Sequence, residues 1–410
     1  MAPSVLAPDS DGAVREAVRD ASATGTRLAV VGNGSKRGLG RPVTADAELS
    51  LYGLSGITYY EPAELVIEAR AGTPLAEIEA ELERHGQRLA FEPGEPGALW
   101  GTGGGTIGGA VACNLSGPRR PFAGAARDHV LGIAAVSGRG EAFVAGGRVV
   151  KNVTGYDMGK LMAGSFGTLA VLTRVTLKVL PRPEAVRTVL LFNQEPSDAL
   201  ETLGGIAGGT WEITAGTHLG PKVASRSAIS YVSVGGGSVT AVRLEGARGA
   251  VAERTAALRT AIAAEGPTEE LHSHNSRAFW TEVRDGCLLP SATGPGPTLW
   301  RLTLPPADAP RILDRLNDFG GEPLFDWLGG LVWVAISGNP AGAEALACRL
   351  RALATEIGGH AVLWRAADEL RARIPVFGDE PPARAALTRA IKRNFDPCGI
   401  LNPGRMFDGV

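Results

Sequence analysis

The stretch GTGGGTIGGAVACNLSG, from Gly101 to Gly117, decides how the rest of this chain is interpreted. Glycine has no Cβ, so backbone N–H groups can approach a ligand closely and the chain can adopt positive φ. Several amides aimed at one point form an anion-binding concavity. The run TIGGAVAC that follows can begin a helix, whose N-terminus favours phosphate. The stretch predicts a phosphate-bearing ligand, although a long flexible loop also explains the glycines.

Two further loops have a similar character. VVGNGSKRGLGRP, from Val30 to Pro42, follows a predicted strand at 27–31. Its G-x-G-x-x-x-G spacing is one residue longer than the Rossmann fingerprint, and it lacks the Walker A order. By itself it is either a phosphate loop or a plain turn. The third loop, from Gly146 to Thr173, contains AGSFG, in which Ala163 replaces the first glycine of a nucleophile elbow. A serine hydrolase is therefore poorly supported.

Composition narrows the class of protein. The chain has 410 residues, which suggests two or three domains. A hydrophobic content of 44% with 20% charged residues is typical of globular proteins. The net charge of −2 gives no electrostatic argument for binding nucleic acid or a membrane. None of the four cysteines forms a C-x-x-C pair, which argues against an iron–sulfur cluster or a zinc site within this chain and fits a reducing compartment.

Neither a secretory signal nor a membrane span is expected. The N-terminal MAPSVLAPDSDG has no basic region followed by an apolar one. No window approaches the roughly 18 apolar residues that a membrane span needs. We expect a cytoplasmic protein, with any membrane association made through partner subunits.

The first part of the chain predicts mixed helices and strands. A short helix is expected at 14–21, and strands at 64–69, 130–136 and 169–179. Thr73 is an expected N-cap with Pro74 at the first helical position, and the helix that follows ends near Gly86. Leu75, Ile78 and Leu82 fall at helical spacing within it.

Pro181-Arg-Pro183 is the first expected domain boundary. Beyond it, two series in the order strand-helix-strand-strand-helix-strand are separated by PSATGPGP at 290–297, and the second has its first helix at 308–317. This order is the split βαβ pattern, and two units side by side predict one antiparallel sheet covered by helices. We expect domains at 1–182 and 183–370. The C-terminal part, 371–410, is expected to pack back on the first domain.

Four motifs in this order resemble the FAD-binding domain of the vanillyl-alcohol oxidase/p-cresol methylhydroxylase superfamily. They are GNGSKRGLG, GTIGGAVACNLSGP with ARDHVLG, KNVTGYDMGKLMAGSFGTLAVLT, and the terminal DPCGILNPGRMF. The chain most closely resembles the family of FAD-binding subunits of bacterial glycolate oxidases. The resemblance is strong over 27–183 and at the C-terminus, and loose over about 185–365. It implies an α+β protein, with a p-cresol methylhydroxylase-type FAD domain of two α/β subdomains and an antiparallel cap of ferredoxin-like units.

The resemblance also implies which residues bind FAD. The amides of Gly32, Asn33, Gly34, Ser35 and Lys36 would hold the pyrophosphate. Thr106, Ile107, Gly108 and Gly109 would contact the ribityl chain and isoalloxazine, whereas Gly101–Gly105 would act as a connector. Asp128 would fix the second loop, and the turn from Gly167 to Val171 would contact the adenine side. Asn402 and Arg405 would lie near the flavin; the family often has lysine in place of Arg405.

Two absences shape the expected mechanism. The first glycine loop has no histidine, so non-covalent FAD is expected. Catalytic relatives carry a metal-binding H-x-G-D-x-N-x-H motif, but here His272 and His274 form an H-x-H without that continuation, in a helix-like or loop stretch, and no metal site is expected. The resemblance therefore implies a flavin subunit that works beside a catalytic FAD subunit and an iron–sulfur subunit of a glycolate oxidase complex.

Two other functions fit the sequence. The chain could be a self-sufficient FAD-dependent dehydrogenase that holds the carboxylate of a small 2-hydroxy acid with Arg119, Arg120 or Tyr156. Solvated surface arginines explain Arg119 and Arg120 equally well. The chain could also be an assembly subunit without flavin. The sequence identifies no catalytic base.

Overall fold

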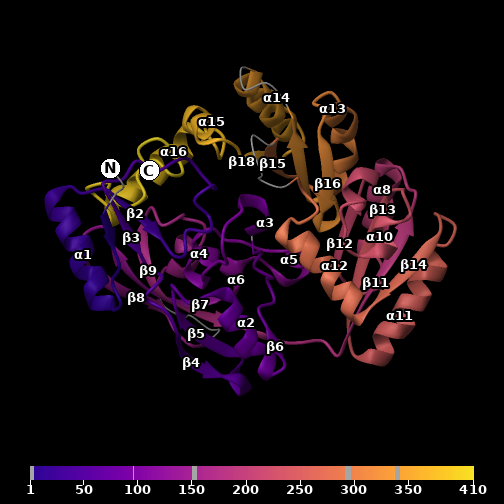
Figure 1. Cartoon of the computed structure of the whole chain (residues 1–410), viewed down its shortest axis with the longest axis horizontal. Coiled ribbons are helices and arrows are strands. Elements are labelled where there is room, and N and C mark those ends of the chain that lie inside the picture. Colours follow the sequence, from indigo (N-terminus) through magenta and orange to yellow (C-terminus); the bar gives the residue numbers. More distant parts are fainter. Residues whose placement is uncertain (1–3, 96, 150–154, 291–296, 338–341) are drawn as a thin grey trace. The chain divides into compact units, whose positions relative to one another are not determined.

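The computed structural model describes residues 4–95, 97–149, 155–290, 297–337 and 342–410. The start of the motif KNVTGYDMGK and most of the Pro/Gly-rich link at 290–297 lie outside these ranges. The chain divides into two compact units. The first contains residues 1–116, 124–182 and 375–410, and the second contains residues 117–123 and 183–374. Figure 1 labels the elements of both units.

The first unit contains two main sheets and a short ribbon. Its parallel sheet has the order β1-β3-β2, and its antiparallel sheet has the order β4-β5-β9-β7-β8. The strands are β1 Ser4–Leu6, β2 Leu28–Val31, β3 Ala47–Ser50, β4 Ile57–Glu61, β5 Val66–Arg70, β6 Gln87–Arg88, β7 Val130–Ser137, β8 Ala142–Gly146, β9 Ala170–Lys178 and β10 Leu180–Pro181. The helices are α1 Asp11–Thr24, η1 Pro62–Glu64, α2 Leu75–Arg84, α3 Gly97–Trp100, α4 Ile107–Ala112, α6 Ala126–His129, α7 Met158–Met162 and α16 Pro382–Phe395.

The alternation VLTRVTLK places β9 at the centre of the antiparallel sheet, between β5 and β7. Helix α2 buries Leu75, Ile78 and Leu82, the three residues that the helical spacing selected. The end of the chain joins the parallel sheet, because the Leu28 N–H donates to the Ile400 carbonyl (2.7 Å) and the Asn402 N–H to the Leu28 carbonyl (2.9 Å).

The second unit is built on one eight-stranded antiparallel sheet in the order β14-β11-β13-β12-β16-β17-β15-β18. The strands are β11 Ala185–Phe192, β12 Ile213–Leu219, β13 Val239–Gly246, β14 Thr268–His272, β15 Thr298–Thr303, β16 Glu322–Asp326, β17 Leu331–Ile336 and β18 His360–Arg365. The helices are α5 Arg120–Ala123, α8 Pro196–Ala207, α9 Pro221–Ala224, α10 Ser230–Ser233, α11 Arg248–Ala261, α12 Ser273–Asp285, η2 Pro306–Ile312, α13 Leu313–Asn317, η3 Trp327–Gly329, α14 Ala343–Glu356 and α15 Asp368–Arg373.

The strand order of this sheet is that of two ferredoxin-like units. Within each ferredoxin-like half of this sheet, the strands lie in the order fourth, first, third, second. The two halves join where β12 pairs with β16. The register places His218 opposite Phe325 and Leu219 opposite Leu324 at this join. The predicted continuous antiparallel sheet is confirmed.

Several local expectations are wrong. Thr73 is not the N-cap of α2: Pro74 takes that position, and the Thr73 hydroxyl instead donates to the Arg70 carbonyl (2.7 Å). The helix expected at 308–317 is α-helical only in its second half, α13, and its first half belongs to the 3-10 helix η2, where Pro310 has no N–H to donate. The residues PLFDWLG, at 323–329, predict one strand, but β16 ends at Asp326, since Trp327 and Leu328 have φ of 50° and 60°. The stretch at His272 and His274 holds the end of β14 and the start of α12.

The buried His218 makes the second unit sensitive to acid. Its Nδ1 lies 2.9 Å from the Thr240 hydroxyl, which donates to Gln194 Oε1 (2.9 Å), so Nδ1 carries the proton. Within the described residues Nε2 has no partner. Burial lowers the pKa of His218 from 6.5 to about 4. The neutral form is thus the folded form, and its stabilisation is complete above pH 6.5 and is lost as the pH falls toward 4.

We therefore expect His218→Asn, which keeps a donor for Thr240, to reduce the acid sensitivity of folding by up to about 3 kcal/mol. The measurement is the free energy of unfolding in urea at pH 7.5 and at pH 4.5. His274→Asn is the matched control, because His274 is exposed. Equal pH dependence in the parent chain and His218→Asn would show that His218 is not the acid-sensitive group.

Candidate functional site

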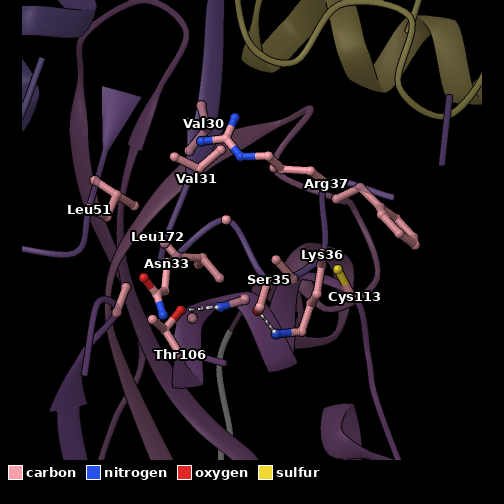
Figure 2. Close-up of a pocket in the computed structure, with 18 of the residues that line it drawn as sticks. Val30, Val31, Asn33, Ser35, Lys36, Arg37, Leu51, Thr106, Cys113 and Leu172 are labelled. Carbon is pink, nitrogen blue, oxygen red and sulfur yellow. Dashed lines mark hydrogen bonds between the residues drawn. The ribbon is translucent and has the colours of Figure 1, made fainter. Parts of the chain in front are cut away.

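The first unit contains a pocket at the end of β2, of the concave kind that holds small molecules and cofactors. Three separate stretches of sequence supply most of its wall, and Figure 2 shows their side chains. The lining residues are Val30, Val31, Gly32, Asn33, Gly34, Ser35, Lys36, Arg37, Leu51, Ala71, Thr106, Gly108, Gly109, Ala112, Cys113, Ser165, Phe166, Gly167, Ala170, Leu172 and Arg405.

The loop after β2 presents a row of backbone donors to this pocket. Gly34 has φ of 69°, and the loop turns through bonds from the Arg37 N–H to the Gly34 carbonyl (3.2 Å) and from the Leu39 N–H to the Lys36 carbonyl (3.1 Å). For the part of the chain that the structure describes, no acceptor is found for the backbone N–H groups of residues 32–36. Such consecutive donors are an anion-binding concavity.

Gly32 packs directly on Thr106, in the glycine-rich stretch Gly101–Gly117. A Cβ built on Gly32 would lie 2.3 Å from the Thr106 Oγ1, so only glycine fits there without displacement. The Thr106 hydroxyl in turn accepts the Gly109 N–H (3.3 Å) and caps α4. The preceding Gly101–Gly105 segment does not line the pocket; it is tied to the first loop by the Asn33 amide, which donates to the Gly104 carbonyl (2.9 Å).

Two buried cations line the same pocket. The Lys36 ammonium donates to the Ser35 hydroxyl (3.1 Å), the one acceptor that it reaches within the described ranges. Burial lowers the pKa of Lys36, and the Arg405 charge acts in the same direction, while Cys113 and Glu95 oppose the shift. The Arg405 guanidinium donates to the Lys36 carbonyl (2.9 Å). This wall of the pocket can hold a negatively charged or oxygen-rich group.

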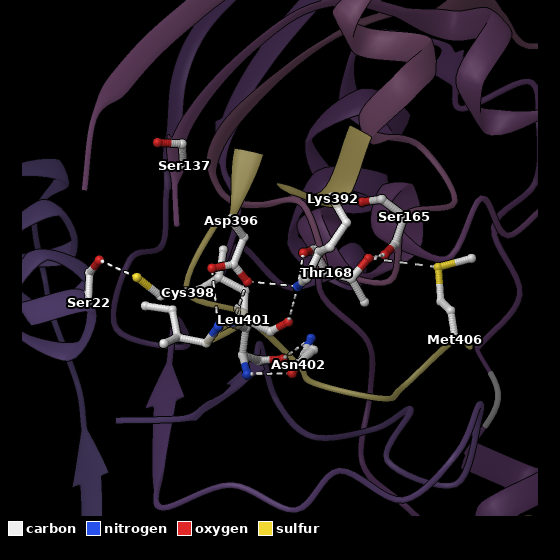
Figure 3. Close-up of polar contacts among 12 residues, drawn as sticks. Ser22, Ser137, Ser165, Thr168, Lys392, Asp396, Cys398, Leu401, Asn402 and Met406 are labelled. Atoms are coloured by element: carbon white, nitrogen blue, oxygen red, sulfur yellow. Dashed lines mark hydrogen bonds and ion pairs between the residues drawn. The ribbon is translucent and has the colours of Figure 1, made fainter. Parts of the chain in front are cut away.

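The C-terminal motif fixes the other side of the pocket (Figure 3). The Asn402 carboxamide accepts the Val30 N–H (2.8 Å) and donates to the Phe166 carbonyl (2.8 Å), so it joins the end of β2 to the turn before β9. A Cβ on Gly167 would lie 2.9 Å from Asn402 Nδ2. Asn402 thus holds two walls together without lining the pocket itself.

A buried ion pair anchors this motif. The Lys392 ammonium donates to Asp396 Oδ2 (2.7 Å), the Thr168 carbonyl (2.6 Å) and the Leu401 carbonyl (3.0 Å). Asp396 also accepts the N–H groups of Ile400 (3.1 Å) and Leu401 (2.8 Å). Burial lowers the pKa of Lys392, and the Asp396 charge opposes this shift. All three ammonium protons have acceptors, so the pair fixes α16, the turn before β9 and the terminal motif relative to each other.

The structure brings most of the expected cofactor residues to one pocket. The ten that line it are Gly32, Asn33, Gly34, Ser35, Lys36, Thr106, Gly108, Gly109, Gly167 and Arg405. Four others do not line it: Asn402, Ile107, Val171 and Asp128. Ile107 and Val171 are fully buried in hydrophobic clusters. Asp128 accepts the Ala125 N–H (2.9 Å), which fixes the backbone before β7.

Sequence reasoning missed several lining residues. Ala170 and Leu172 face the pocket because strand side chains alternate, so Val171 between them points away. The alternation VLTRVTLK was a sufficient signal for this. Leu51 and Ala71 carry no such signal, since they lie just beyond the ends of β3 and β5 and reach the pocket only through the folding of distant segments. Cys113 is the C-cap of α4 and reaches the pocket with Gly108 and Gly109.

The three expected substrate residues belong to different units. Arg119 and Arg120 lie in the second unit and Tyr156 in the first, where its side chain is 90% exposed. The buried Arg119 guanidinium pairs with both carboxylate oxygens of Glu245 (2.5 and 3.0 Å), so its charge is matched inside the protein. The guanidinium carbon of Arg120 lies 4.6 Å from the ring centroid of Trp327.

Among the described residues, no group of three or more His, Cys, Asp and Glu side chains could hold a metal ion. His272 is exposed at the end of β14, where its Nε2 lies 3.6 Å from Glu270 Oε1. Across the same residues, no helix combines the length and the apolar composition that crossing a bilayer requires.

Comparisons with known proteins agree with this pocket. Residues 2–146 match the FAD binding domain family. The chain is 38% identical over 407 residues to the glycolate oxidase subunit GlcE of Escherichia coli (strain K12), which covers 97% of this chain and 98% of that protein. It is 31% identical over 180 residues to a D-lactate dehydrogenase of Anaerostipes hadrus, over 44% of this chain and 35% of that one.

Comparison with solved structures gives the fold. The structure aligns with p-cresol methylhydroxylase at a TM-score of 0.70 and 13% identity, covering 98% of this chain and 88% of that one. The expected p-cresol methylhydroxylase-type fold and FAD-binding domain are confirmed. With near-complete coverage in both directions, this FAD-binding chain belongs to the family of the glycolate oxidase subunit GlcE.

Proposed function

We propose that this chain is the FAD-binding subunit of a complex that oxidises glycolate, or another small 2-hydroxy acid, to the corresponding 2-oxo acid. The observation that carries the proposal is the pocket, in which unbonded backbone amides and two buried cations meet glycine loops. The relationship to GlcE supplies the substrate class and the complex. Electrons would pass from the flavin to an iron–sulfur partner.

The residues of the pocket fit FAD. The amides of residues 32–36 and the Lys36 ammonium would hold the pyrophosphate, because these donors have few acceptors within the described protein. Thr106, Gly108 and Gly109 would contact the ribityl chain and ring, with Arg405 beside them, and Gly167 the adenine side. When bound, FAD accepts a hydride and releases electrons singly. The Lys36 and Arg405 charges would stabilise negative charge on its oxygens.

We propose that FAD is held without a covalent bond. Among the described lining residues there is no histidine or tyrosine. Cys113 does line the pocket, but burial raises the pKa of its thiol, which keeps it protonated and a weak nucleophile.

Purification of the full chain alone tests this function. We expect FAD to co-purify at about one per chain and to leave the protein fully on acid precipitation. Anaerobic glycolate is expected not to bleach it until the catalytic and iron–sulfur subunits are added. Bleaching by glycolate with this chain alone would favour a self-sufficient dehydrogenase. Absence of flavin would favour an assembly subunit.

A further inference from the structure

A cluster of tryptophan side chains lies wholly within the second unit, around Arg301 on β15. The Arg301 guanidinium carbon lies 5.0 Å from the ring centroid of Trp327, 5.8 Å from that of Trp333 and 5.1 Å from that of Trp364. Trp333 and Trp364 themselves pack edge to face with centroids 5.2 Å apart. The cation is therefore surrounded by three indole rings, which contribute cation–π attraction but offer no acceptor for its N–H groups.

Arg301 differs from two other arginines of the second unit, Arg119 and Arg187, in having no carboxylate of the described residues within 4 Å. Arg119 pairs with Glu245, and Arg187 donates to Glu270 Oε1 (2.7 Å). Arg301 reaches neither a carboxylate within 4 Å nor any hydrogen-bond acceptor among the residues that the structure describes. Arg301 is only partly buried, and none of its guanidinium nitrogens is among the fully buried unpartnered atoms of the described residues, so an acceptor from outside the chain can reach them.

The charges around Arg301 indicate an anion of low charge. Arg120 contacts the same Trp327 ring, at 4.6 Å from its centroid. Burial and the Arg120 charge lower the pKa of Arg301 to about 9, partly opposed by Asp326. Arg301 thus stays protonated at neutral pH. The nearby Asp326 carboxylate accepts the Trp327 N–H (2.8 Å) and would repel a multiply charged ligand.

We propose that Arg301 binds the carboxylate of a small organic monoacid, with Trp327, Trp333 and Trp364 as its apolar walls. A guanidinium fork matches the two oxygens of a carboxylate. The inference rests on the proposed function for the identity of the acid, a two- or three-carbon 2-hydroxy or 2-oxo acid.

The experiment uses the full chain with its FAD and oxamate, a monocarboxylate that cannot be oxidised. Because three tryptophans surround Arg301, oxamate is expected to change tryptophan fluorescence saturably. Arg301→Gln is expected to weaken binding about 10- to 100-fold, since hydrogen bonds to charged groups are lost. Arg301→Lys keeps the positive charge, and its affinity for oxamate is expected to lie between those of the parent chain and Arg301→Gln. Arg349→Gln, a guanidinium 4.6 Å from the Phe319 centroid, is the matched control and is expected to bind normally.

Three results would overturn the inference: no saturable response in the parent chain, equal oxamate affinity in Arg301→Gln, or sulfate binding as tightly as oxamate. Melting temperatures show whether each variant is folded, and Arg301→Lys tests the site if Arg301→Gln is not. FAD content is measured on the same samples. Flavin present without Arg301-dependent binding contradicts this inference alone, whereas oxamate binding without flavin contradicts the proposed function alone.

Discussion

Gly32→Ala is expected to yield protein that has lost FAD. The new Cβ would lie 2.3 Å from Thr106 Oγ1 and 3.1 Å from Thr106 Cγ2, so the loop carrying the amides of residues 32–36 must move away from α4. Displacing two amide–phosphate bonds corresponds to about 3–6 kcal/mol, or more than about 100-fold in affinity. The measurement is the dissociation constant of FAD, by fluorescence titration of the flavin-free chain.

A double mutant separates this clash from simple unfolding. Thr106→Ala removes both clashing atoms, at a cost of about 1 kcal/mol for the lost cap. Gly32→Ala combined with Thr106→Ala should therefore bind FAD better than Gly32→Ala alone. Gly204→Ala is the matched control, because a Cβ there meets nothing within 4 Å. If the double variant binds no better than the single one, the contact between Gly32 and Thr106 is not what limits binding.

Lys392→Met is expected to destabilise the first unit by about 3–5 kcal/mol. The substitution leaves the fully buried Asp396 carboxylate without its counter-ion and the Thr168 and Leu401 carbonyls without donors. Because the same ammonium holds the terminal motif, Asn402 and Arg405 should also become less firmly placed, and FAD affinity should fall. The measurement is urea unfolding with and without added FAD.

We expect the loss of stability in Lys392→Met to come from the burial of the ion pair, because an exposed ion pair contributes little. Lys160 and Asp157 form a comparable pair (3.2 Å), but both side chains are more than half exposed. Lys160→Met is expected to change stability by no more than about 0.5 kcal/mol. Lys392→Met combined with Asp396→Asn should recover part of the loss, because no charge is then left buried. A double variant as unstable as Lys392→Met would argue against an unpaired carboxylate as the cause.

Much of the fold could be predicted because its signals are local. The helix expected at 14–21 is α1, which is longer at both ends, with Ser10 as its N-cap and Gly25 in the left-handed region after its last residue. Strand β14, by contrast, is required by the expected series but has no signal in its own residues: TEELH lies at the sheet edge, where partly exposed charged residues hide the usual strand pattern. The backbone reversal at Trp327 and Leu328 was also not predictable, because neither residue type favours positive φ.

The candidate site divides in the same way. Gly32, Thr106 and Gly167 stand in continuous motifs and could be predicted from the sequence. The residues of β9 that face the pocket could be predicted only from the alternation of side chains along the strand. The role of Asn402 depends on Val30, 372 positions away, and that of Arg119 on Glu245, 126 positions away. Charge and residue type alone cannot reveal such pairings, so Arg119 resembled a ligand-binding residue when its charge is matched internally.

The division of the chain has an evolutionary consequence. The polypeptide passes between its two units four times, at 116/117, 123/124, 182/183 and 374/375. A single genetic crossover near residue 183 would therefore transfer residues 183–374 of the second unit without its residues 117–123. Glu245 would then face whichever residue the recipient protein has at position 119. Recombination between relatives should succeed only where residues 117–123 travel with the sheet that they belong to.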